Sequence, residues 1–446
     1  MNPWLCVLMP TLDGAAFVAD ALESVAREND PGIHCIVVDG GSKDATVSVV
    51  RSFAARLPMT ILERSDSTGW VWSTNLALNS AQAPNCCFLH QDDLWLSGRA
   101  AVMKRVLNEA PEVAMVAHAV RYVDRTGRNV GRLSCPWRPW PARLKAAETM
   151  PRLLVQNFIA VPGAVFRTDL AKSCGGLDES LWYTADWDFW LKLSSAGPVA
   201  YCPTELAAFR LHAGSQTARG SADQSGFEQQ LEIVLERHLE RVHELPPAVR
   251  KAARLSARVN AALAYESHGG AADWESLAAQ ALRAGPAAWL RYLRDSRITG
   301  RIISRIRAGS ATPEGENLLA AAFTRHRMLR FLVVGVVNTA FSYAVYALFV
   351  FLGAGVRWAS LISLVAGILF GFLSQGMIVF PGFGRWAFAR FLVVSALLYH
   401  FFIALVFVAE SVGINNYVGG ALAAPVVAAF SYFLQSRFVF PGRKGP

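Results

Sequence analysis

The stretch Cys35–Asp44, CIVVDGGSKD, decides how the first half of this chain folds. Its apolar residues favour a buried strand, and an acidic, glycine-rich loop ends that strand at Asp39. We expect similar short strands at Leu5–Met9, Met59–Glu63 and Cys86–Leu89, with segments of helical spacing between them. This alternation predicts a parallel sheet with helices on both faces.

Acidic residues follow the ends of these strands. Ligands of such sheets bind at the carboxyl ends of the strands, which here carry the loops Pro10–Asp13, Asp39–Gly41 and His90–Asp93. A carboxylate at Asp39 can accept hydrogen bonds from a base N–H and from ribose hydroxyls, and the glycines allow close backbone approach. The alternative is an ordinary turn, because Asp-Gly is common in turns.

Four further side chains are candidates for chemistry. Asp92 and Asp93 suit a hard divalent cation that bridges a diphosphate, although an aspartate there could also cap a helix. Asp186 opens an apolar helix, either as a cap or as the general base for an acceptor hydroxyl. His212 is a possible metal or phosphate ligand, although a lone histidine is more often structural.

The composition changes sharply toward the C-terminus. The 446 residues are 53% hydrophobic and only 17% charged, against roughly 25% charged in soluble domains. The deficit comes from the region Leu329–Phe440. It contains four apolar segments, each near the roughly 20 residues that span a bilayer: Leu329–Leu352, Trp358–Phe380, Phe388–Ala409 and Tyr417–Phe440.

This apolar region contains an internal repeat. The sequence RFLVV occurs at Arg330 and again at Arg390, and VFPG occurs at Val379 and again at Val439. Both pairs are separated by the same offset of about sixty residues, so each repeat holds two spans. An even number of spans preserves direction, and we therefore expect parallel copies related by an axis along the membrane normal.

The distribution of charge predicts the orientation. Lys and Arg precede the first span, lie between the second and third, and follow the last, whereas the other two loops hold few of them. This places both termini and the soluble part in the cytoplasm, at the inner membrane. The seven cysteines include no zinc-binding spacing and are expected to be small buried thiols, which fits a reducing compartment. Met1 leads directly into a strand, so we expect no signal peptide.

The net charge of +9 also has a membrane explanation. Arginines crowd Arg283–Arg330, just before the first span, where basic residues meet anionic lipid. Within this segment Ala287–Arg307 is either a helix lying in the membrane interface or a solvated helix packed on the soluble domain. No basic stripe interleaved with aromatic residues is present, and we expect no nucleic-acid partner.

Taken together, the soluble motifs resemble the family 2 glycosyltransferases. The resemblance covers Trp4–Thr217 and rests on six pieces in order: Met9–Asp13, Ile36–Thr46, Gly69 to Asn75, Gln91–Trp95, Gly175–Asp178 with the helix from Asp186, and Arg210–Gln216. It implies an α/β GT-A fold, a Rossmann-like nucleotide-diphospho-sugar transferase, and inverting transfer from a nucleotide-activated sugar. Four residues depart from the usual pattern: Leu12, Asp13, Trp72 and Gln91.

The resemblance also implies roles for individual residues. Asp93 and His212 would hold Mg²⁺ or Mn²⁺, and Asp186 would act as the catalytic base. The nucleotide sugar would be bound by residues of the other motifs: Pro10, Thr11, Asp13, Asp39, Asp66, Asn75 and Asp92.

The C-terminal part is similar to the GtrA-like family of four-span membrane proteins linked to cell-envelope glycan synthesis. The matching pieces are Arg330–Asn338 and Phe433–Phe440, although Gln375 and Gln435 stand where an Asn-Arg pair is common. The resemblance implies an all-α four-helix transmembrane domain. The family is proposed to help move a polyprenyl-phosphate-linked sugar across the membrane.

We therefore predict three parts: a transferase domain at 1–220, a helical basic linker at 221–325 and a transmembrane domain at 326–446, with repeats at 330–382 and 390–442. The expected activity is glycosyl transfer from a nucleotide-diphosphate sugar to a polyprenyl phosphate or lipid-linked glycan at the membrane. The alternative is a translocator of polyprenyl-linked sugar whose transferase domain only binds. A third possibility is that the spans serve only as an anchor.

Overall fold

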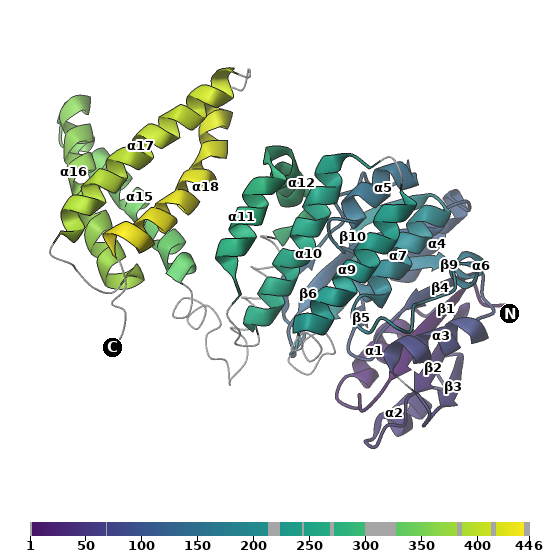
Figure 1. Ribbon diagram of the computed structural model, residues 1–446. Helices are drawn as coiled ribbons and strands as arrows, with labels where there is room; N and C mark the ends of the chain where they lie inside the picture. Colours follow the sequence, from purple (N-terminus) through teal and green to yellow (C-terminus); the bar gives the residue numbers. More distant parts are fainter. Residues whose placement is uncertain are drawn as a thin grey trace. The chain divides into compact units, whose positions relative to one another are not determined.

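The computed structural model describes residues 2–67, 69–212, 224–242, 245–267, 272–298, 327–380, 386–411 and 416–440. It divides into two compact units, Met1–Pro313 and Glu314–Pro446. The first unit is built on one sheet, and the second consists of helices α15–α18 (Figure 1).

The sheet of the first unit runs in the order β3-β2-β1-β4-β9-β6-β10-β5, with β7 paired to β6 and β8 paired to β10. Its strands are β1 Leu5–Thr11, β2 Ile33–Asp39, β3 Met59–Glu63, β4 Asn85–Phe88, β5 Leu94–Trp95, β6 Met115–Val123, β7 Asn129–Leu133, β8 Arg143–Leu144, β9 Ala164–Arg167 and β10 Val199–Arg210. The first four strands are parallel to one another, as the sequence predicts.

The second half of the sheet, for which the sequence predicts no strand direction, is mixed. Strand β9 runs antiparallel to both β4 and β6, and β5 runs antiparallel to β10. A strand covered on both faces is apolar throughout whichever way it runs, so the sequence pattern does not reveal its direction. The sheet with helices on both faces agrees with the α/β fold expected for this chain.

Two hydrophobic cores lie on the two faces of the sheet. Alternate residues of β1 and β2 point to opposite faces, with Leu8 and Val38 in one core and Val7 and Val37 in the other. The second core packs α1 Val18–Ala26, α2 Thr46–Ser52 and α4 Arg99–Glu109. The first core packs α3 Trp70–Ser80, α5 Ala146–Leu153, α6 Thr168–Ser173 and α7 Ala185–Ala196. Six cysteines are buried in these layers, Cys174 is half-buried, and all seven are free thiols, as expected.

Four helices extend the first core beyond the sheet. They are α9 Gln224–Arg241, α10 Pro247–Ser267, α11 Trp274–Ala284 and α12 Pro286–Ser296. Buried residues such as Val234 of α9 and Val249 of α10 belong to the same core as Trp190 of α7. Figure 1 shows α9 between α7 and α10. The described helices of the predicted linker region therefore pack on the sheet domain; the three-part division itself stays a prediction.

Helix α12 has two unlike faces. Ala288 and Tyr292 are buried, whereas Trp289, Leu290 and Leu293 are exposed. This described part of the predicted interfacial helix packs on its neighbours and also presents apolar side chains outward, so both interpretations of it stay open. Its continuation after residue 298 lies outside the described residues.

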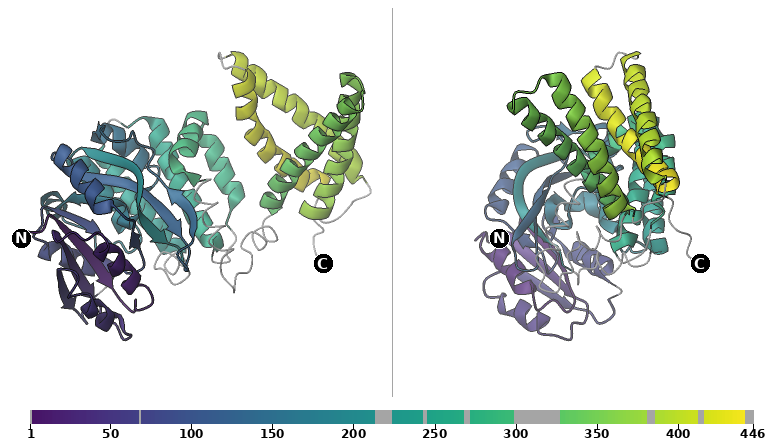
Figure 2. Two further views of the ribbon diagram at one scale, coloured as in Figure 1. Left: turned by 180° about the vertical axis from the view of Figure 1, so that it is seen from behind. Right: turned by 90° about the vertical axis from the view of Figure 1, so that its left-hand side faces the viewer.

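The second unit contains two helix pairs, α15 Arg327–Phe351 with α16 Val356–Ser374, and α17 Ala387–Ser411 with α18 Asn416–Leu434 (Figure 2). Three described segments are long and apolar enough to cross a membrane, namely Arg330–Phe349, Ser360–Val379 and Ala387–Ser411. The fourth expected span forms α18 and the turn after it. Within its described residues the apolar stretch Val426–Val439 is shorter.

Both pairs end alike. A π-helical turn follows α16 at Gln375–Val379 and another follows α18 at Gln435–Val439. The phenyl rings of Phe380 and Phe440 after these turns stack with centroids 5.4 Å apart. The repeated sequence thus corresponds to a repeated arrangement of elements.

Candidate active site

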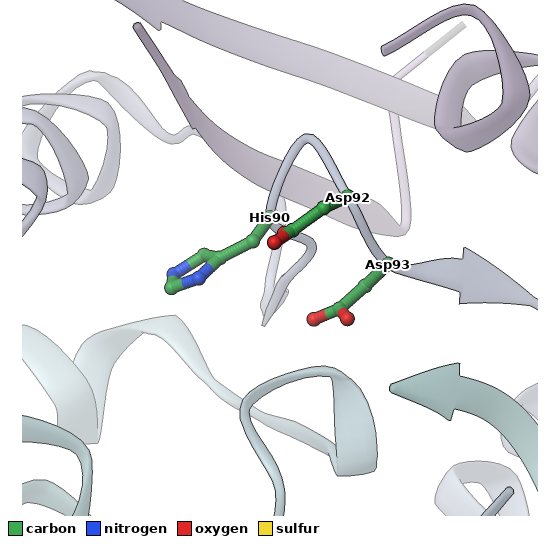
Figure 3. Close-up of side chains that lie close together, drawn as sticks. All are labelled: His90, Asp92 and Asp93. Carbon is green, nitrogen blue, oxygen red and sulfur yellow. The ribbon is translucent and has the colours of Figure 1, made fainter. Parts of the chain in front are cut away.

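The loop between β4 and β5 carries the strongest concentration of potential ligands. Figure 3 shows His90, Asp92 and Asp93 projecting from this one loop. One ligand atom from each of them lies within 4.8 Å of the others. The loop follows β4 because the buried strand ends at Phe88, and the next residues leave the sheet at its carboxyl edge.

Burial changes the pKa values of all three side chains in this loop, Asp93, Asp92 and His90. Asp93 is buried, and its desolvation, reinforced by the negative charge of Asp92, raises the pKa of Asp93 well above its usual range. Burial alone would also raise the pKa of Asp92, but a hydrogen bond from His212 and nearby histidine charge lower it below the ordinary value. Burial lowers the pKa of His90, which favours the neutral imidazole. A bound cation would favour ionisation of both carboxylates.

Two polar atoms of the loop have no hydrogen-bond partner within the described chain, Asp93 Oδ2 and His90 Nε2. A carboxylate oxygen and a neutral imidazole nitrogen are both electron-pair donors, and a buried one without a partner is costly. The donor set therefore fits a divalent cation. The sequence singled out Asp93 but missed His90, although His90 is the first residue of the same loop.

Arg210, at the end of β10, and the nearby His212 form hydrogen bonds to Asp92 and Asp93. The backbone N–H of Arg210 donates to Asp93 Oδ1 at 3.1 Å, and the Arg210 Nε–H donates to the backbone oxygen of Asp92 at 2.9 Å. Two residues later, His212 Nε2 lies 2.9 Å from Asp92 Oδ2. His212 thus contacts the acidic pair through Asp92, and its predicted role as a metal ligand stays a prediction. Arg210 was quoted in the sequence motif without a role, and its contacts form across a gap of more than one hundred residues.

Asp186 lies in different surroundings, at the start of α7. Its Oδ2 accepts a hydrogen bond from Asn157 Nδ2 at 2.9 Å, and its Oδ1 accepts one from the backbone N–H of Trp187 at 2.8 Å. Burial raises the pKa of Asp186 to about 6, while these neutral donors oppose the rise. Such a carboxylate is ionised near neutral pH and basic enough to take a proton. The partner Asn157 was not found from the sequence.

Asp188, in the same first turn of α7, is held by ion pairs. The buried Asp188 pairs with Lys192 at 2.7 Å, with Arg237 at 2.9 Å and with His238 at 2.9 Å. Burial opposes ionisation of Asp188, but these partners hold its pKa far below the usual range. Because Arg237 and His238 belong to α9, this network docks α9 on the helix that carries Asp186.

The Asp39 carboxylate organises its own loop. It is buried and accepts hydrogen bonds from Thr11 Oγ1, from the backbone N–H groups of Gly41 and Ser42, and from the Ser42 hydroxyl. Gly41 has a φ of 90°, a conformation that favours glycine. A nucleotide base would have to compete with these bonds, and base binding by Asp39 stays a prediction.

The β1 loop is tied to both neighbouring loops. Pro10 and Thr11 end β1, and the Asp13 carboxylate accepts from the Lys43 backbone N–H at 2.8 Å. The Gln91 side-chain amide accepts from Leu12 N–H at 2.9 Å and donates to Leu12 O at 3.0 Å. A carboxylate cannot do both when ionised, so this pairing accounts for glutamine at a position where an acid is common.

The last two predicted sugar-nucleotide contacts lie in local networks. Asp66 is exposed and paired with Arg64 at 2.9 Å. The Asn75 amide donates to Leu177 O and to Glu179 and accepts from the Leu177 N–H, which fixes α3 to the loop before α7. Their roles in binding stay predictions.

Comparison with known proteins agrees with this arrangement. Residues 6–174 match the family described as "Glycosyl transferase family 2", and residues 330–440 match "GtrA/DPMS, transmembrane domain". The chain is therefore a glycosyltransferase that joins a family 2 domain to a GtrA/DPMS membrane domain.

The curated relatives match about half of the chain. An uncharacterized protein of Mycobacterium tuberculosis is 28% identical over 231 residues, covering 49% of this chain and 70% of the relative. An uncharacterized glycosyltransferase of Rickettsia typhi is 22% identical, covering 48% and 66%. A PGL/p-HBAD biosynthesis glycosyltransferase of Mycobacterium bovis is 27% identical, covering 42% and 68%.

Two solved structures align with about 70% of this chain at low identity. A crystal structure of S. aureus TarS 1–349 in complex with UDP-GlcNAc gives a TM-score of 0.49 at 16% identity, covering 70% of this chain and 91% of that chain. The mannosyltransferase PcManGT from Pyrobaculum calidifontis, in complex with GDP-Man and Mn²⁺, gives 0.42 at 16%, covering 69% and 87%.

Proposed function

We propose that this protein transfers a sugar, with inversion, from a nucleotide-diphosphate donor to a polyprenyl phosphate or lipid-linked glycan in cell-envelope polysaccharide synthesis. The observation that carries the proposal is the buried Oδ2 of Asp93, which has no hydrogen-bond partner among the described residues and lies beside Asp92 and His90. The loop His90–Asp93 lies at the carboxyl edge of the sheet, where such sheets bind ligands. Its free carboxylate and imidazole atoms suit the divalent cation that accompanies a nucleotide diphosphate.

Asp93, Asp92 and His90 would hold Mg²⁺ or Mn²⁺, with His212 acting on Asp92. The ion, when bound, would stabilise negative charge on the departing diphosphate. Arg210 keeps both acidic residues in place through its backbone N–H and its guanidinium. The loops that hold Pro10, Thr11, Asp13 and Asp39 would receive the nucleotide, and Asp66 and Asn75 would lie at its margin.

Asp186 would act on the acceptor. In a single displacement the acceptor oxygen bonds to the anomeric carbon while the bond from that carbon to the diphosphate breaks. A hydroxyl acceptor must lose its proton, which Asp186 can accept because burial raises its pKa to about 6. A phosphate acceptor is already ionised near neutral pH and needs little help from a base.

The membrane unit supports a lipid-bound acceptor. Three described segments have the length and composition of membrane spans, so the transferase domain is tied to a bilayer. We propose that both termini and the transferase domain lie on the cytoplasmic side of the inner membrane, on the basis of the Lys and Arg distribution.

Turnover of donors by the purified full-length protein tests this function. UDP- and GDP-sugars would be supplied with Mn²⁺, Mg²⁺ or EDTA and a membrane lipid extract as acceptor source. We expect nucleotide diphosphate release with at least one donor, dependent on the metal and on the extract. Absence of release from every donor under all conditions would contradict the proposal.

The unusual residues Gln91 and Trp72 could favour the alternative, a translocator with a transferase domain that only binds. The amide of Gln91 pairs on both sides with the Leu12 backbone, and the guanidinium of Arg64 lies 5.8 Å from the Trp72 ring. Both departures therefore have local structural roles and give no sign of a decayed site.

A further inference from the structure

The side chain of Gln156 joins helix α10 to the segment that follows α5. Its Oε1 accepts a hydrogen bond from Asn260 Nδ2 at 3.0 Å and another from Ser256 Oγ at 3.3 Å, and both donors belong to α10. Its Nε2 group donates to the backbone oxygen of Asn157 at 3.2 Å. Gln156 and Ser256 are buried, where a polar group needs a hydrogen-bond partner. Both ends of the Gln156 amide are therefore used to tie the chain at Asn157 to α10.

Asn157 connects this amide to the carboxylate of Asp186. Asn157 Nδ2 donates to Asp186 Oδ2 at 2.9 Å, and Asn157 Oδ1 accepts from the backbone N–H of Ile159 at 3.2 Å. A side-chain amide has one donor end and one acceptor end, so the bond from Ile159 turns the donor end of Asn157 toward Asp186. A donor at this place favours the charged form of the carboxylate.

Helix α9 holds the other segment beside Asp186. The backbone N–H of Tyr183 donates to Gln230 Oε1 at 2.9 Å, and the Thr184 hydroxyl donates to the backbone oxygen of Gln230 at 3.5 Å. Gln230 is buried on α9, and Thr184 directly precedes α7, whose second residue is Asp186. Contacts with α9 thus fix the start of α7, whereas contacts with α10 fix the side chain that donates to Asp186.

The charged side chains nearby do not bond to this carboxylate. Those on α7, on α9 and in the loop before α7 pair with one another: Asp178, Asp188, Lys192, Arg237 and His238. Burial raises the pKa of Asp186, and hydrogen bonds from Asn157 and from backbone N–H groups lower it. Among the described residues, Asn157 is therefore the one side chain that donates to Asp186.

We propose that Gln156 is a positioning residue for the transfer step: anchored on α10, it fixes Asn157 so that the Asn157 amide donates to Asp186. The proposal rests on the proposed function, because it takes Asp186 as the base for a hydroxyl acceptor. Loss of the Gln156 amide leaves the base in place but releases the Asn157 donor. Asp186 then loses both its orientation and part of the stabilisation of its charged form. A phosphate acceptor needs little help from a base and does not depend on this contact.

The variant Gln156→Leu in the full-length protein, reconstituted in phosphatidylcholine vesicles, tests the proposal. Hexyl glucoside serves as the hydroxyl acceptor and a polyprenyl phosphate as the phosphate acceptor. With hexyl glucoside we expect kcat to fall about tenfold, because a displaced base loses part of its usual contribution, while the KM for the nucleotide sugar stays the same. With the polyprenyl phosphate the rate should stay within about twofold of the wild type. An equal loss with both acceptors would show a merely structural role and overturn the proposal.

The pH profile with hexyl glucoside shows whether Gln156 acts through Asn157. Gln156→Leu should move the rising limb of kcat to higher pH by about half a unit, because it weakens the donor that favours the charged carboxylate. In the Asn157→Leu background the same change should move the limb no further, since two variants that act through one contact are not additive. A limb that stays in place in the single variant, or that moves again in the double variant, would contradict the proposal.

The matched control is Arg254→Ala, which removes a contact between α10 and α9 that does not involve Gln156. Arg254 and Glu236 form an exposed ion pair at 3.0 Å. Its loss should leave the rates with both acceptors and the pH profile at their wild-type values. An effect of this control equal to that of Gln156→Leu would show that any loosening of α10 is sufficient and would overturn the specific role of Gln156.

Hydrogen exchange measures the same contact without turnover. The Ile159 N–H is bonded to Asn157 Oδ1, so mass spectrometry of a peptide that contains both residues reports whether Asn157 is held. We expect exchange at Ile159 to be at least about fivefold faster in Gln156→Leu, or in Asn260→Ala if the first variant misfolds, and unchanged in Arg254→Ala. Unchanged exchange in the first two variants would overturn the proposal. A wild-type protein that releases no nucleotide would contradict the proposed function alone, and the exchange result would still decide whether Gln156 positions Asn157.

Discussion

The two acidic regions of the soluble unit, the loop His90–Asp93 and the start of α7 at Asp186, contain the same kind of side chain in opposite surroundings. In the first, two adjacent carboxylates meet histidines and the backbone N–H of Arg210. In the second, a single carboxylate meets the neutral amide of Asn157 and a backbone N–H.

The difference separates two kinds of chemistry. In the loop, one carboxylate has a lowered pKa and its neighbour a raised one, and a buried oxygen of Asp93 has no described partner. A divalent cation, as proposed, would complete that arrangement. At α7 no described cationic group bonds to Asp186, and burial brings its pKa to about 6, which suits transfer of a proton. The two proposed roles thus follow from the surroundings of the carboxylates and not from the residue type.

The largest effect is expected from Asp93→Ala. Removing the central ligand should lower nucleotide release at least about a thousandfold, because a catalytic cation contributes several kcal/mol to the transition state. Steady-state assays with Mn²⁺ and Mg²⁺ measure the loss. Asp169→Ala, which removes an exposed carboxylate paired with Arg167, is the matched control and should keep the wild-type rate. Full activity of Asp93→Ala would contradict the proposal that Asp93 binds the cation.

The next effect concerns Asp186→Asn. With a hydroxyl acceptor we expect a loss of about 10²- to 10⁴-fold, the usual contribution of a general base. Because the variant also removes a buried charge, its melting temperature at pH 8 should equal or exceed that of the wild type. Assays with hydroxyl and phosphate acceptors, together with thermal unfolding, check both points. An unchanged rate with a hydroxyl acceptor would remove Asp186 from the mechanism.

The pH profile sharpens the same distinction. A base with a pKa of about 6 is protonated below that pH, so kcat with a hydroxyl acceptor should fall about tenfold per pH unit below 6 and level off above it. Asn157→Leu removes a donor that favours the charged carboxylate, which should move the rising limb to higher pH by about one unit. A limb that stays in place in Asn157→Leu would show that Asn157 does not act on Asp186.

The smallest effect is expected at Gln91, on the edge of the cation loop. Gln91→Glu loses the hydrogen bond from the side-chain amide to Leu12 O, at a cost of roughly 1 kcal/mol in stability, and nucleotide release should fall only a few-fold. Denaturant unfolding and turnover measure the two quantities. A more active variant would indicate that an acid is preferred here and would reopen the interpretation of a decayed site.

The sequence predicts most of the architecture because its signals are local. Strand ends, the acidic loop after β4 and the membrane spans each occupy a few consecutive residues, and the repeat is visible by alignment of the chain with itself. Local pattern did not reveal the antiparallel direction of β9, since a strand buried on both faces has no directional signature.

The missed residues depend on contacts between distant segments. Arg210 meets Asp93 only because β10 lies next to β5 in the sheet, and Asn157 reaches Asp186 from the segment after α5. His90 was missed for another reason. A lone histidine in a sequence is usually structural, and only the positions of Asp92 and Asp93 next to it in space identify His90 as a candidate ligand.

Binding of Mn²⁺ in the presence of a nucleoside diphosphate tests the division of roles most directly. Electron paramagnetic resonance of free Mn²⁺, titrated with the full-length protein and UDP or GDP, reports binding without turnover. We predict that the wild type and Asp186→Asn bind the ion equally, whereas Asp93→Asn does not. Retained binding in Asp93→Asn, or its loss in Asp186→Asn, would contradict the assignment of the cation to the loop and of the proton to α7.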